Sequence, residues 1–369
     1  MNPSFIPIAA PVLNGNEKAY VNDCLDTGWI SSNGKYIARF EKEFAAYCGV
    51  GHAVACCNGT VALHVALLAL GIGPGDEVIV PTITFVATAN AVHYVGATPV
   101  FADSDRATWN LDPADVARKI TARTKAIIAV HLYGQPADMD ALATLAKKHG
   151  LSLVEDAAEA HGALYRGRRA GSLGDVATFS FYGNKNLTTG EGGMCVTNDG
   201  PLREKMRQLC WQGMDPVRRY WFPVVGYNYR MTNIAAALGV AQLERLEWHL
   251  ARRREVFALY KERLSDVVEW QPEAEWANHA CWMFTALLAP KFDRDAVGTA
   301  LLAKGVETRP VFPPMHLLPT YAHLTAPGSL PVGEDLSRRG LNLPTGAHLS
   351  REDVERVCAS LRSVLEQNA

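Results

Sequence analysis

The chain has 369 residues, of which 48% are apolar and 20% are charged, and its 36 lysines and arginines nearly balance 38 aspartates and glutamates. This composition excludes an intrinsically disordered chain, and the formal net charge of −2 provides neither a basic face for nucleic acid nor an acidic tail. The length exceeds what one hydrophobic core usually serves, so we expect a large domain at residues 1–250 and a small one at residues 251–369.

Features of secreted, membrane and metal-binding proteins are not expected. Residues 1–10 do not combine a basic segment with an apolar one, and the longest apolar run, Val61 to Leu70, is far shorter than the ~20 residues of a membrane span. The eight cysteines form no C-x-x-C pair, and the eleven histidines form no H-x-x-x-H cluster. We therefore expect a cytoplasmic protein with reduced thiols, no metal site, and no membrane or nucleic-acid partner.

Short apolar runs alternate with helical patterns from residue 52 onward. In chain order the pattern predicts a strand at 52–57, a helix at 60–70, a strand at 77–80, a helix at 84–95, a strand at 99–102, a helix at 112–120, a strand at 125–131, a helix at 139–149, strands at 151–155, 176–182 and 193–197, and a helix at 201–210. This alternation predicts an α/β fold with a mostly parallel sheet and helices on both faces. Ligands of such sheets bind beyond the carboxyl ends of the strands, so residues that directly follow strands are the first candidates for chemistry.

The last third of the chain has a different pattern. Residues 231–264 predict one long helix that is apolar in its first half and charged in its second. Such a helix would connect two domains and would be buried at one end and solvated at the other. Strands expected at 281–288 and 307–311, with helices at 293–304 and 351–366, predict a small α+β domain after it.

Three positions that follow predicted strands carry groups suited to chemistry. Gly59 and Thr60 begin a helix, where free backbone N–H groups can bind an anion, although many strand–helix turns hold Gly-Thr for conformational reasons alone. Asp156 ends an apolar strand, where it is either a site carboxylate or the N-cap of a following helix. Lys185 also follows an apolar strand, where partial burial would lower the pKa of its amine and make it a nucleophile, although a single loop lysine is more often simply solvated.

An anion site, a carboxylate and an amine at one sheet edge are together the groups needed to hold pyridoxal phosphate. The phosphate binds helix-terminal N–H groups, the aldehyde reacts with the amine, and the carboxylate keeps the pyridine nitrogen protonated. No G-x-G-x-x-G segment follows a predicted strand and no G-x-x-x-x-G-K-[ST] segment occurs, which disfavours a nicotinamide or nucleoside-triphosphate enzyme.

Longer segments resemble, in the same order, those of the DegT/DnrJ/EryC1/StrS family of nucleotide-sugar aminotransferases that depend on pyridoxal phosphate. The matching segments are residues 26–31 (DTGWIS), 73–81 (GPGDEVIVP), 130–134 (VHLYG), 155–162 (EDAAEAHG), 190–193 (GEGG) and 227–231 (YNYRM). The resemblance implies the fold of aspartate aminotransferase, which is fold type I of these transferases. It also implies a homodimer with shared active sites, alone or as half of a tetramer.

The same resemblance implies roles for individual residues. Lys185 matches the lysine that binds the cofactor covalently and moves a proton during catalysis, and Asp156 matches the partner of the pyridine nitrogen. The further matches to cofactor-binding positions are Gly59, Thr60 and Ser180 for the phosphate, Phe85 for the aromatic ring stacked on the cofactor, Glu159 near its phenolic oxygen, and Asn228 for a contact from the other subunit. On helical periodicity alone, an ordinary core aromatic is the lesser alternative for Phe85. Asn58 stands where many relatives have serine, which puts a side-chain phosphate contact there in question but not the backbone contacts.

Within the family, residues 212–216, 218–223 and 309–316 resemble most those of members that aminate a GDP-linked sugar. The expected reaction transfers the amino group of L-glutamate to C4 of GDP-4-keto-6-deoxy-D-mannose, giving GDP-perosamine and 2-oxoglutarate for O-antigen or another surface polysaccharide. The residues expected to line the sugar–nucleotide pocket are Trp29, Arg219, Tyr220, Trp221, Arg309, His316 and Tyr321. Surface salt bridges are an equal alternative for the two arginines, and a hydrogen-bonded buried histidine is the alternative for His316.

Three other functions stay open at this point. The ketosugar could carry UDP or dTDP instead of GDP. A sugar 3-dehydratase of the same scaffold is a second alternative, but relatives that remove a hydroxyl have histidine where this chain has Lys185. A cofactor-binding regulatory protein is the third, although the sequence shows no helix-turn-helix pattern or basic extension.

Overall fold

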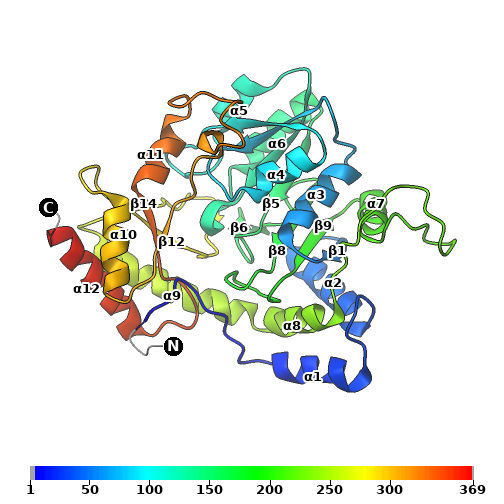
Figure 1. The fold of residues 1–369 in the computed structure, drawn as a ribbon, viewed down its shortest axis with the longest axis horizontal. Coiled ribbons are helices and arrows are strands. Elements are labelled where there is room, and N and C mark those ends of the chain that lie inside the picture. The colour runs from blue at the N-terminus through cyan, green and yellow to red at the C-terminus, as the bar shows by residue number, and fades with distance from the viewer. Residues whose placement is uncertain (1–4, 368–369) are drawn as a thin grey trace.

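A seven-stranded sheet forms the centre of the larger half of the molecule in the computed structural model, which describes residues 5–367 (Figure 1). In spatial order its strands are β1 (His52–Cys56), β9 (Gly193–Thr197), β8 (Val176–Ser180), β5 (Ser152–Asp156), β4 (Thr124–Val130), β2 (Glu77–Pro81) and β3 (Thr98–Ala102). β9 pairs antiparallel with β1 and β8, whereas the pairs from β8 through β5, β4 and β2 to β3 are parallel. The α/β class and the mostly parallel sheet are therefore confirmed.

Helices cover both faces of this sheet because its strands bury alternate side chains on opposite sides. Val78 and Val80 of β2 pack into one apolar cluster, and Ile79 between them packs into another on the opposite face. The first face is covered by α3 (Gly59–Ala69), α4 (Ala87–Tyr94) and α7 (Gly200–Cys210). The second is covered by α2 (Lys35–Cys48), α5 (Pro113–Lys119), α6 (Met139–His149) and α8 (Asn233–Glu244), with α1 (Glu17–Thr27) packed on α8.

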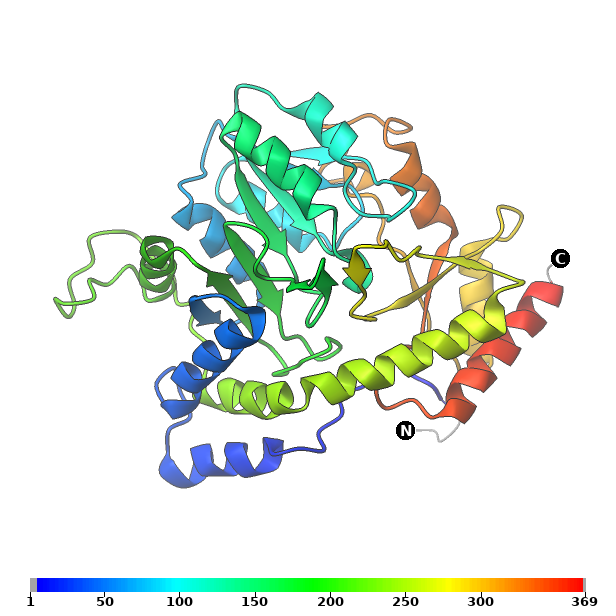
Figure 2. The ribbon, with the colours of Figure 1, turned by 180° about the vertical axis from the view of Figure 1, so that it is seen from behind.

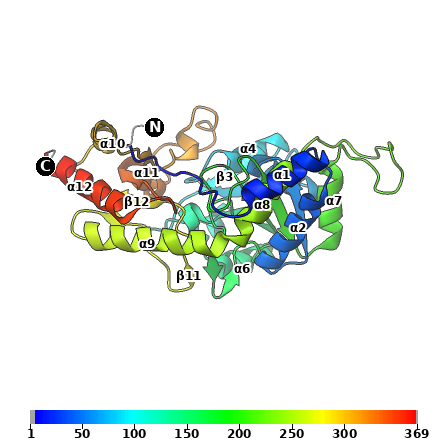
Figure 3. The same ribbon diagram turned by 90° about the horizontal axis from the view of Figure 1, so that it is seen from below.

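The single helix expected at residues 231–264 is wrong, because the structure has two helices there. α8 ends at Glu244, and Arg245, with φ −108° and ψ 0°, separates it from α9 (Leu246–Leu264). No Pro or Gly marks this break; α8 packs against α1 and α2, whereas α9 packs against α12 (Arg351–Gln367), as Figure 3 shows. The expectation of a charged half that is solvated all round is also wrong, since α9 buries one face along its length, including Arg253 and Tyr260. Like every other helix within residues 5–367, it is not long and apolar enough to cross a membrane.

The smaller half contains a four-stranded antiparallel sheet. In spatial order its strands are β10 (Glu269–Trp270), β12 (Phe284–Leu287), β14 (Gly340–Leu343) and β13 (Arg309–Pro310). Together with α9, α10 (Arg294–Ala303) and α12, this sheet encloses a separate apolar core. Ile6 pairs with Val306 of this half, and α9 crosses residue 250, so the domain boundary proposed there stays a prediction.

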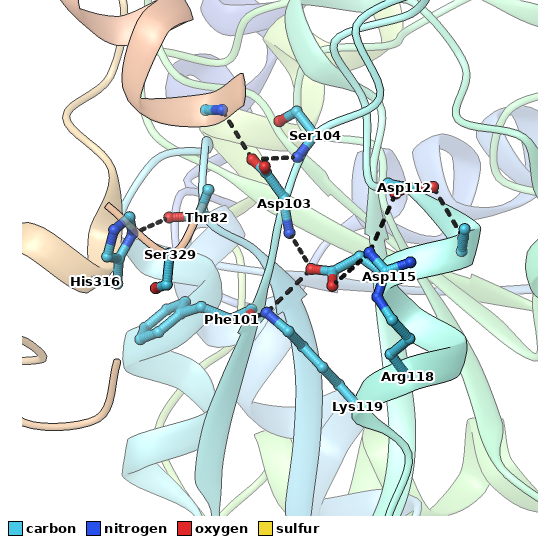
Figure 4. A network of polar contacts seen from close by, with 12 residues as sticks. Thr82, Phe101, Asp103, Ser104, Asp112, Asp115, Arg118, Lys119, His316 and Ser329 are labelled. Atoms are coloured by element: carbon cyan, nitrogen blue, oxygen red, sulfur yellow. Dashed lines mark hydrogen bonds and ion pairs between the residues drawn. The ribbon is translucent and has the colours of Figure 1, made fainter. Parts of the chain in front are cut away.

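Contacts made by β11 (Ala277–Asn278) and α11 (Pro331–Arg339) are among those that join the halves. β11 pairs with β6 (Leu164–Tyr165), which in turn pairs with β7 (Arg168–Arg169) in a small antiparallel sheet. α11 begins on the carboxylate of Asp103, which accepts hydrogen bonds from the backbone N–H groups of Val332 (3.1 Å) and Gly333 (2.8 Å). Figure 4 shows Asp103 at the end of β3 beside Ser104 and Asp115. The smaller half is thus fastened to the sheet edge at which the parallel strands end.

Candidate active site

Two carboxylates and an amine lie together at the edge of the seven-stranded sheet where its parallel strands end. β5 ends at Asp156, and its parallel neighbour β8 ends at Ser180, shortly before Lys185. The side chains of Asp156 and Glu159 are only 5% and 3% exposed, and Lys185 is partly buried. The charges of both carboxylates act on the Lys185 amine. The structure therefore brings together the predicted lysine and the two predicted acids.

Asp156 is held in a fixed orientation by two hydrogen bonds. The hydroxyl of Thr88, in the first turn of α4, donates to Oδ2 at 2.7 Å, and the backbone N–H of Ala158 donates to Oδ1 at 3.2 Å. Burial raises the pKa of Asp156, against the opposing effect of these two bonds. No helix begins within residues 157–163, so the alternative of a helix N-cap is wrong. Sequence analysis missed Thr88, whose only signal was its position one helical turn after Phe85.

Glu159 and Lys185 perturb each other. Burial raises the pKa of Glu159 to about 7, although the charge of Lys185 and a 2.7 Å hydrogen bond from the backbone N–H of Tyr133 oppose that rise. Burial also lowers the pKa of the Lys185 amine, against the opposing charges of Glu159 and Asp156. A lysine with a lowered pKa can supply a free amine near neutral pH, which nucleophilic and proton-transfer chemistry requires.

The start of α3 lies next to Ser180 and has backbone N–H groups suited to an anion. The Asn58 side chain caps the helix by accepting a hydrogen bond from the backbone N–H of Val61 at 3.0 Å, so it is already engaged. The N–H groups of Gly59 and Thr60 precede Ala62, the first intrahelical donor, so the helix itself provides no acceptor for them and they are suited to a ligand. A Cβ atom on Gly59 would lie 2.6 Å from Cβ of Ser180, so only glycine allows the helix start to lie this close to the end of β8.

Phe85 directly precedes α4 and is 57% exposed, which argues against an ordinary core role. Its ring meets Phe312 at a centroid distance of 6.0 Å, and Thr88 one turn later contacts Asp156. The exposed ring therefore lies at the same sheet edge as the carboxylates. Together, the helix start, the ring, the acids and the amine fit a phosphate-bearing aromatic aldehyde.

A tryptophan that sequence analysis missed also contacts the lysine. Nζ of Lys185 lies 3.8 Å from the centroid of the Trp282 ring. Trp282 belongs to the segment between β11 and β12, which is remote from Lys185 in the chain. Neither spacing nor periodicity relates the two residues, so no local signal could have found this contact.

Residues 212–227 form a loop that projects from the larger half beyond α7 (Figure 1 and, from behind, Figure 2). Its base is closed by a bridge between Trp211 and Asn228, and Asn228 is exposed. The loop carries the predicted pocket residues Arg219, Tyr220 and Trp221, and Tyr220 and Trp221 are 72% and 50% exposed. The structure thus places these three residues away from Lys185 of the same chain.

The other predicted pocket residues lie in different surroundings. Trp29 is exposed, and Arg309 pairs with Glu307 on the surface, at 2.7 Å. His316 is fully buried, with Nδ1 2.6 Å from the Thr82 hydroxyl, as Figure 4 shows, and Nε2 3.0 Å from a carboxylate oxygen of Glu334. Tyr321 is also buried and donates to Oδ1 of Asn90 at 2.7 Å. Substrate binding by His316 and Tyr321 stays a prediction, and it would require both side chains to exchange these partners.

The family model of the DegT/DnrJ/EryC1/StrS aminotransferases matches residues 11–362. The chain belongs to this family. Among curated relatives, it is 57% identical to the GDP-perosamine synthase of Caulobacter vibrioides and 49% identical to that of Escherichia coli O157:H7. These matches cover 98% and 97% of this chain, respectively, and 98% of each relative. Among solved structures, S. venezuelae DesV is 42% identical, with a TM-score of 0.89 and 94% of each chain covered.

Membership of this aminotransferase family establishes pyridoxal phosphate as the cofactor and the aspartate-aminotransferase type of fold. The groups described above suit that cofactor, since they provide an anion site, an aromatic face, a carboxylate and an amine. Among residues 5–367, no group of three or more His, Cys, Asp or Glu side chains could hold a metal ion.

Proposed function

We propose that this enzyme moves the amino group of L-glutamate to C4 of GDP-4-keto-6-deoxy-D-mannose, forming GDP-perosamine and 2-oxoglutarate. The similarity to two GDP-perosamine synthases over nearly the whole chain supports this substrate. The observation that carries the chemistry is the partly buried Lys185 amine beside two buried carboxylates. Lysine at this position also supports amino transfer over dehydration, since it can serve both halves of the exchange.

Each part of the site has a proposed role. Gly59, Thr60 and Ser180 would bind the cofactor phosphate, Phe85 would cover its ring, and Glu159 would lie near its phenolic oxygen. When bound, pyridoxal phosphate supplies an aldehyde that takes an amino group from one substrate and gives it to another. Asp156 would keep a proton on the ring nitrogen, and its two hydrogen bonds hold the carboxylate in place.

Lys185 would bind the cofactor and carry the proton that leaves or joins the substrate carbon. Its lowered pKa makes the neutral amine accessible, so Nζ can accept a proton and return it. Glutamate and the nucleotide sugar would react one after the other at the same site, and Lys185 would serve both reactions. The nucleotide must therefore be bound mainly by groups remote from Lys185, for which Trp29, Arg219, Tyr220, Trp221 and Arg309 are our candidates.

The purified protein tests this proposal directly. It should convert the GDP-linked ketosugar with glutamate, and mass spectrometry should detect the amino sugar. The UDP- and dTDP-linked 4-ketosugars are the matched controls. Turnover of only one of these controls would overturn the GDP assignment, and release of ammonia with a deoxysugar would indicate a dehydratase. Borohydride reduction followed by peptide mapping should place the cofactor on Lys185.

We further propose a homodimer, or a tetramer of two such dimers, in which each subunit completes the other's site. The exposed aromatic residues of the loop at 212–227 and the exposed Asn228 support this arrangement. Mixing the Lys185→Ala variant with a Tyr220→Ala/Trp221→Ala variant should restore about a quarter of the wild-type kcat/KM for the nucleotide sugar, because half of random dimers would contain one intact site. No restored activity after subunit exchange would contradict shared sites.

We also propose that the enzyme acts in the cytoplasm, where it supplies an amino sugar for O-antigen or another surface polysaccharide. All eight cysteines are free in the structure, and seven of them are buried, which suits a reducing compartment. Cell fractionation with an antibody against the protein would test this location, and recovery outside the cytoplasm would contradict it.

A further inference from the structure

The segment 280–282 fastens the backbone on both sides of Lys185. Nδ2 of Asn186 donates to the carbonyl of Ala280 at 2.7 Å, and Nε1 of Trp282 donates to the carbonyl of Asn184 at 2.9 Å. These two bonds involve the residues immediately before and after the lysine. The loop that carries Lys185 is therefore held by a segment from the beginning of the smaller half.

The indole ring of Trp282 also contacts the amine itself. Nζ of Lys185 lies 3.8 Å from the ring centroid, well within the ~6 Å over which an aromatic face attracts a cation. Trp282 is only 5% exposed, so little water competes for this contact. Because a lysine side chain has four flexible carbons, nearby carboxylates alone do not define one position for its amine.

Trp282 is in turn held firmly. Its backbone N–H donates to the carbonyl of Tyr133 at 3.1 Å, and its carbonyl accepts from Nη1 of Arg253 at 2.9 Å. Its ring stacks with that of Tyr133 at a centroid distance of 6.1 Å and an angle of 26°. The preceding Cys281 has φ +55°, a conformation that costs energy for a residue other than glycine and that the surrounding bonds must maintain.

We propose that Trp282 is a positioning residue for amino transfer, whose indole face holds the Lys185 amine whenever that amine is free during the catalytic cycle. This inference rests on the function proposed above, in which Lys185 carries the cofactor and the proton. The charges of Asp156 and Glu159 act on the same amine, and the charge of Lys185 acts in turn on the ring of His161. His161 is neutral near pH 7, because burial lowers its pKa to about 3. The ring therefore adds an uncharged attraction to that of the two carboxylates.

Fluorinated tryptophans at position 282 test the contact without changing its shape. Fluorine withdraws electron density from the ring face and weakens its attraction for a cation. The pKa of Lys185 in the cofactor-free protein can be measured from the rate at which an amine reagent modifies this lysine at different pH values. This pKa should fall stepwise with fluorination, by about one unit for tetrafluorotryptophan. The same substitution at Trp276, which packs against Tyr165, is the control and should leave that pKa unchanged. An unchanged Lys185 pKa with fluorination at 282 would overturn the proposal.

The holoenzyme provides a second, independent readout. Trp282→Leu should lower kcat about 10- to 100-fold while KM for glutamate changes less than about threefold, because a misplaced amine slows proton transfer more than binding. Trp282→Phe retains an aromatic face and should recover most of kcat, and Trp276→Phe should behave as wild type.

A Trp282→Leu enzyme that folds and has normal kcat would contradict the proposal. If that variant does not fold, the fluorinated series decides. If borohydride labels Lys185 but the Trp282 variants behave as wild type, only this inference fails; if Lys185 is not labelled, the proposed function fails.

Discussion

The pocket around Lys185 and the projecting loop at 212–227 differ in how completely residues of one chain surround them. In the pocket, Asp156, Glu159 and Lys185 are buried or partly buried, and contacts from other segments fix each of them. In the loop, Tyr220 and Trp221 remain largely exposed at the end of a long excursion (Figure 1). Large exposed aromatic groups are typical of surfaces that bind something else. This difference supports the proposal that one chain holds the chemistry, whereas the loop serves recognition together with a second subunit.

The largest effect should follow removal of the amine from the pocket. Lys185→Ala should lower turnover at least ~10³-fold, because nucleophile and proton carrier are lost together. The cofactor should no longer be retained after borohydride treatment and denaturation. Lys291→Ala, which removes a lysine of the smaller half that lies against Phe292, is the control. Normal turnover by Lys185→Ala would place the chemistry elsewhere.

Asp156→Asn should lower turnover about 10²- to 10³-fold, because an amide cannot hold the ring nitrogen protonated as a carboxylate does. The amide keeps nearly the same shape, so thermal unfolding should change little. Turnover and cofactor affinity, measured together, separate this electrostatic effect from simple loss of binding. Equal activity of the variant and the wild type would remove Asp156 from the mechanism.

Glu159→Gln should remove a pH dependence of stability that arises in the pocket. A buried acid whose pKa is raised to about 7 binds its proton more tightly in the folded state than in the unfolded state. Its contribution therefore destabilises the cofactor-free protein progressively as pH rises from about 4.5 to 7, by up to about 3 kcal/mol. Denaturant titrations across this range should show a flatter profile for Glu159→Gln, whereas Glu352→Gln, at an exposed position of α12, should keep the wild-type slope.

The smallest of these effects is expected in the loop. Tyr220→Ala/Trp221→Ala should raise KM for the nucleotide sugar about 10-fold, with KM for glutamate and the absorbance of the bound cofactor unchanged. Val217→Ala, at a 93% exposed position of the same loop, is the control. A change in KM for glutamate instead would mean that the loop acts on the pocket rather than on the nucleotide.

Sequence analysis predicted most of what lies along single strands. Buried parallel strands are continuous apolar runs, so the end of such a run located Asp156 and Lys185 at the sheet edge. Contacts between distant segments left no such pattern. The break at Arg245 follows from packing against different neighbours, and the contacts of Thr88 with Asp156 and of Trp282 with Lys185 depend on how loops meet in space. His316 illustrates the same limit, because only its surroundings show both ring nitrogens engaged.

α9 is connected to the surroundings of the Lys185 amine through Arg253. Arg253 of this helix is buried, forms no ion pair with any residue from 5 to 367, and instead donates to the carbonyls of Trp282 and Thr345. Because the Trp282 ring contacts the Lys185 amine, α9 is connected to that amine through the carbonyl of a single residue.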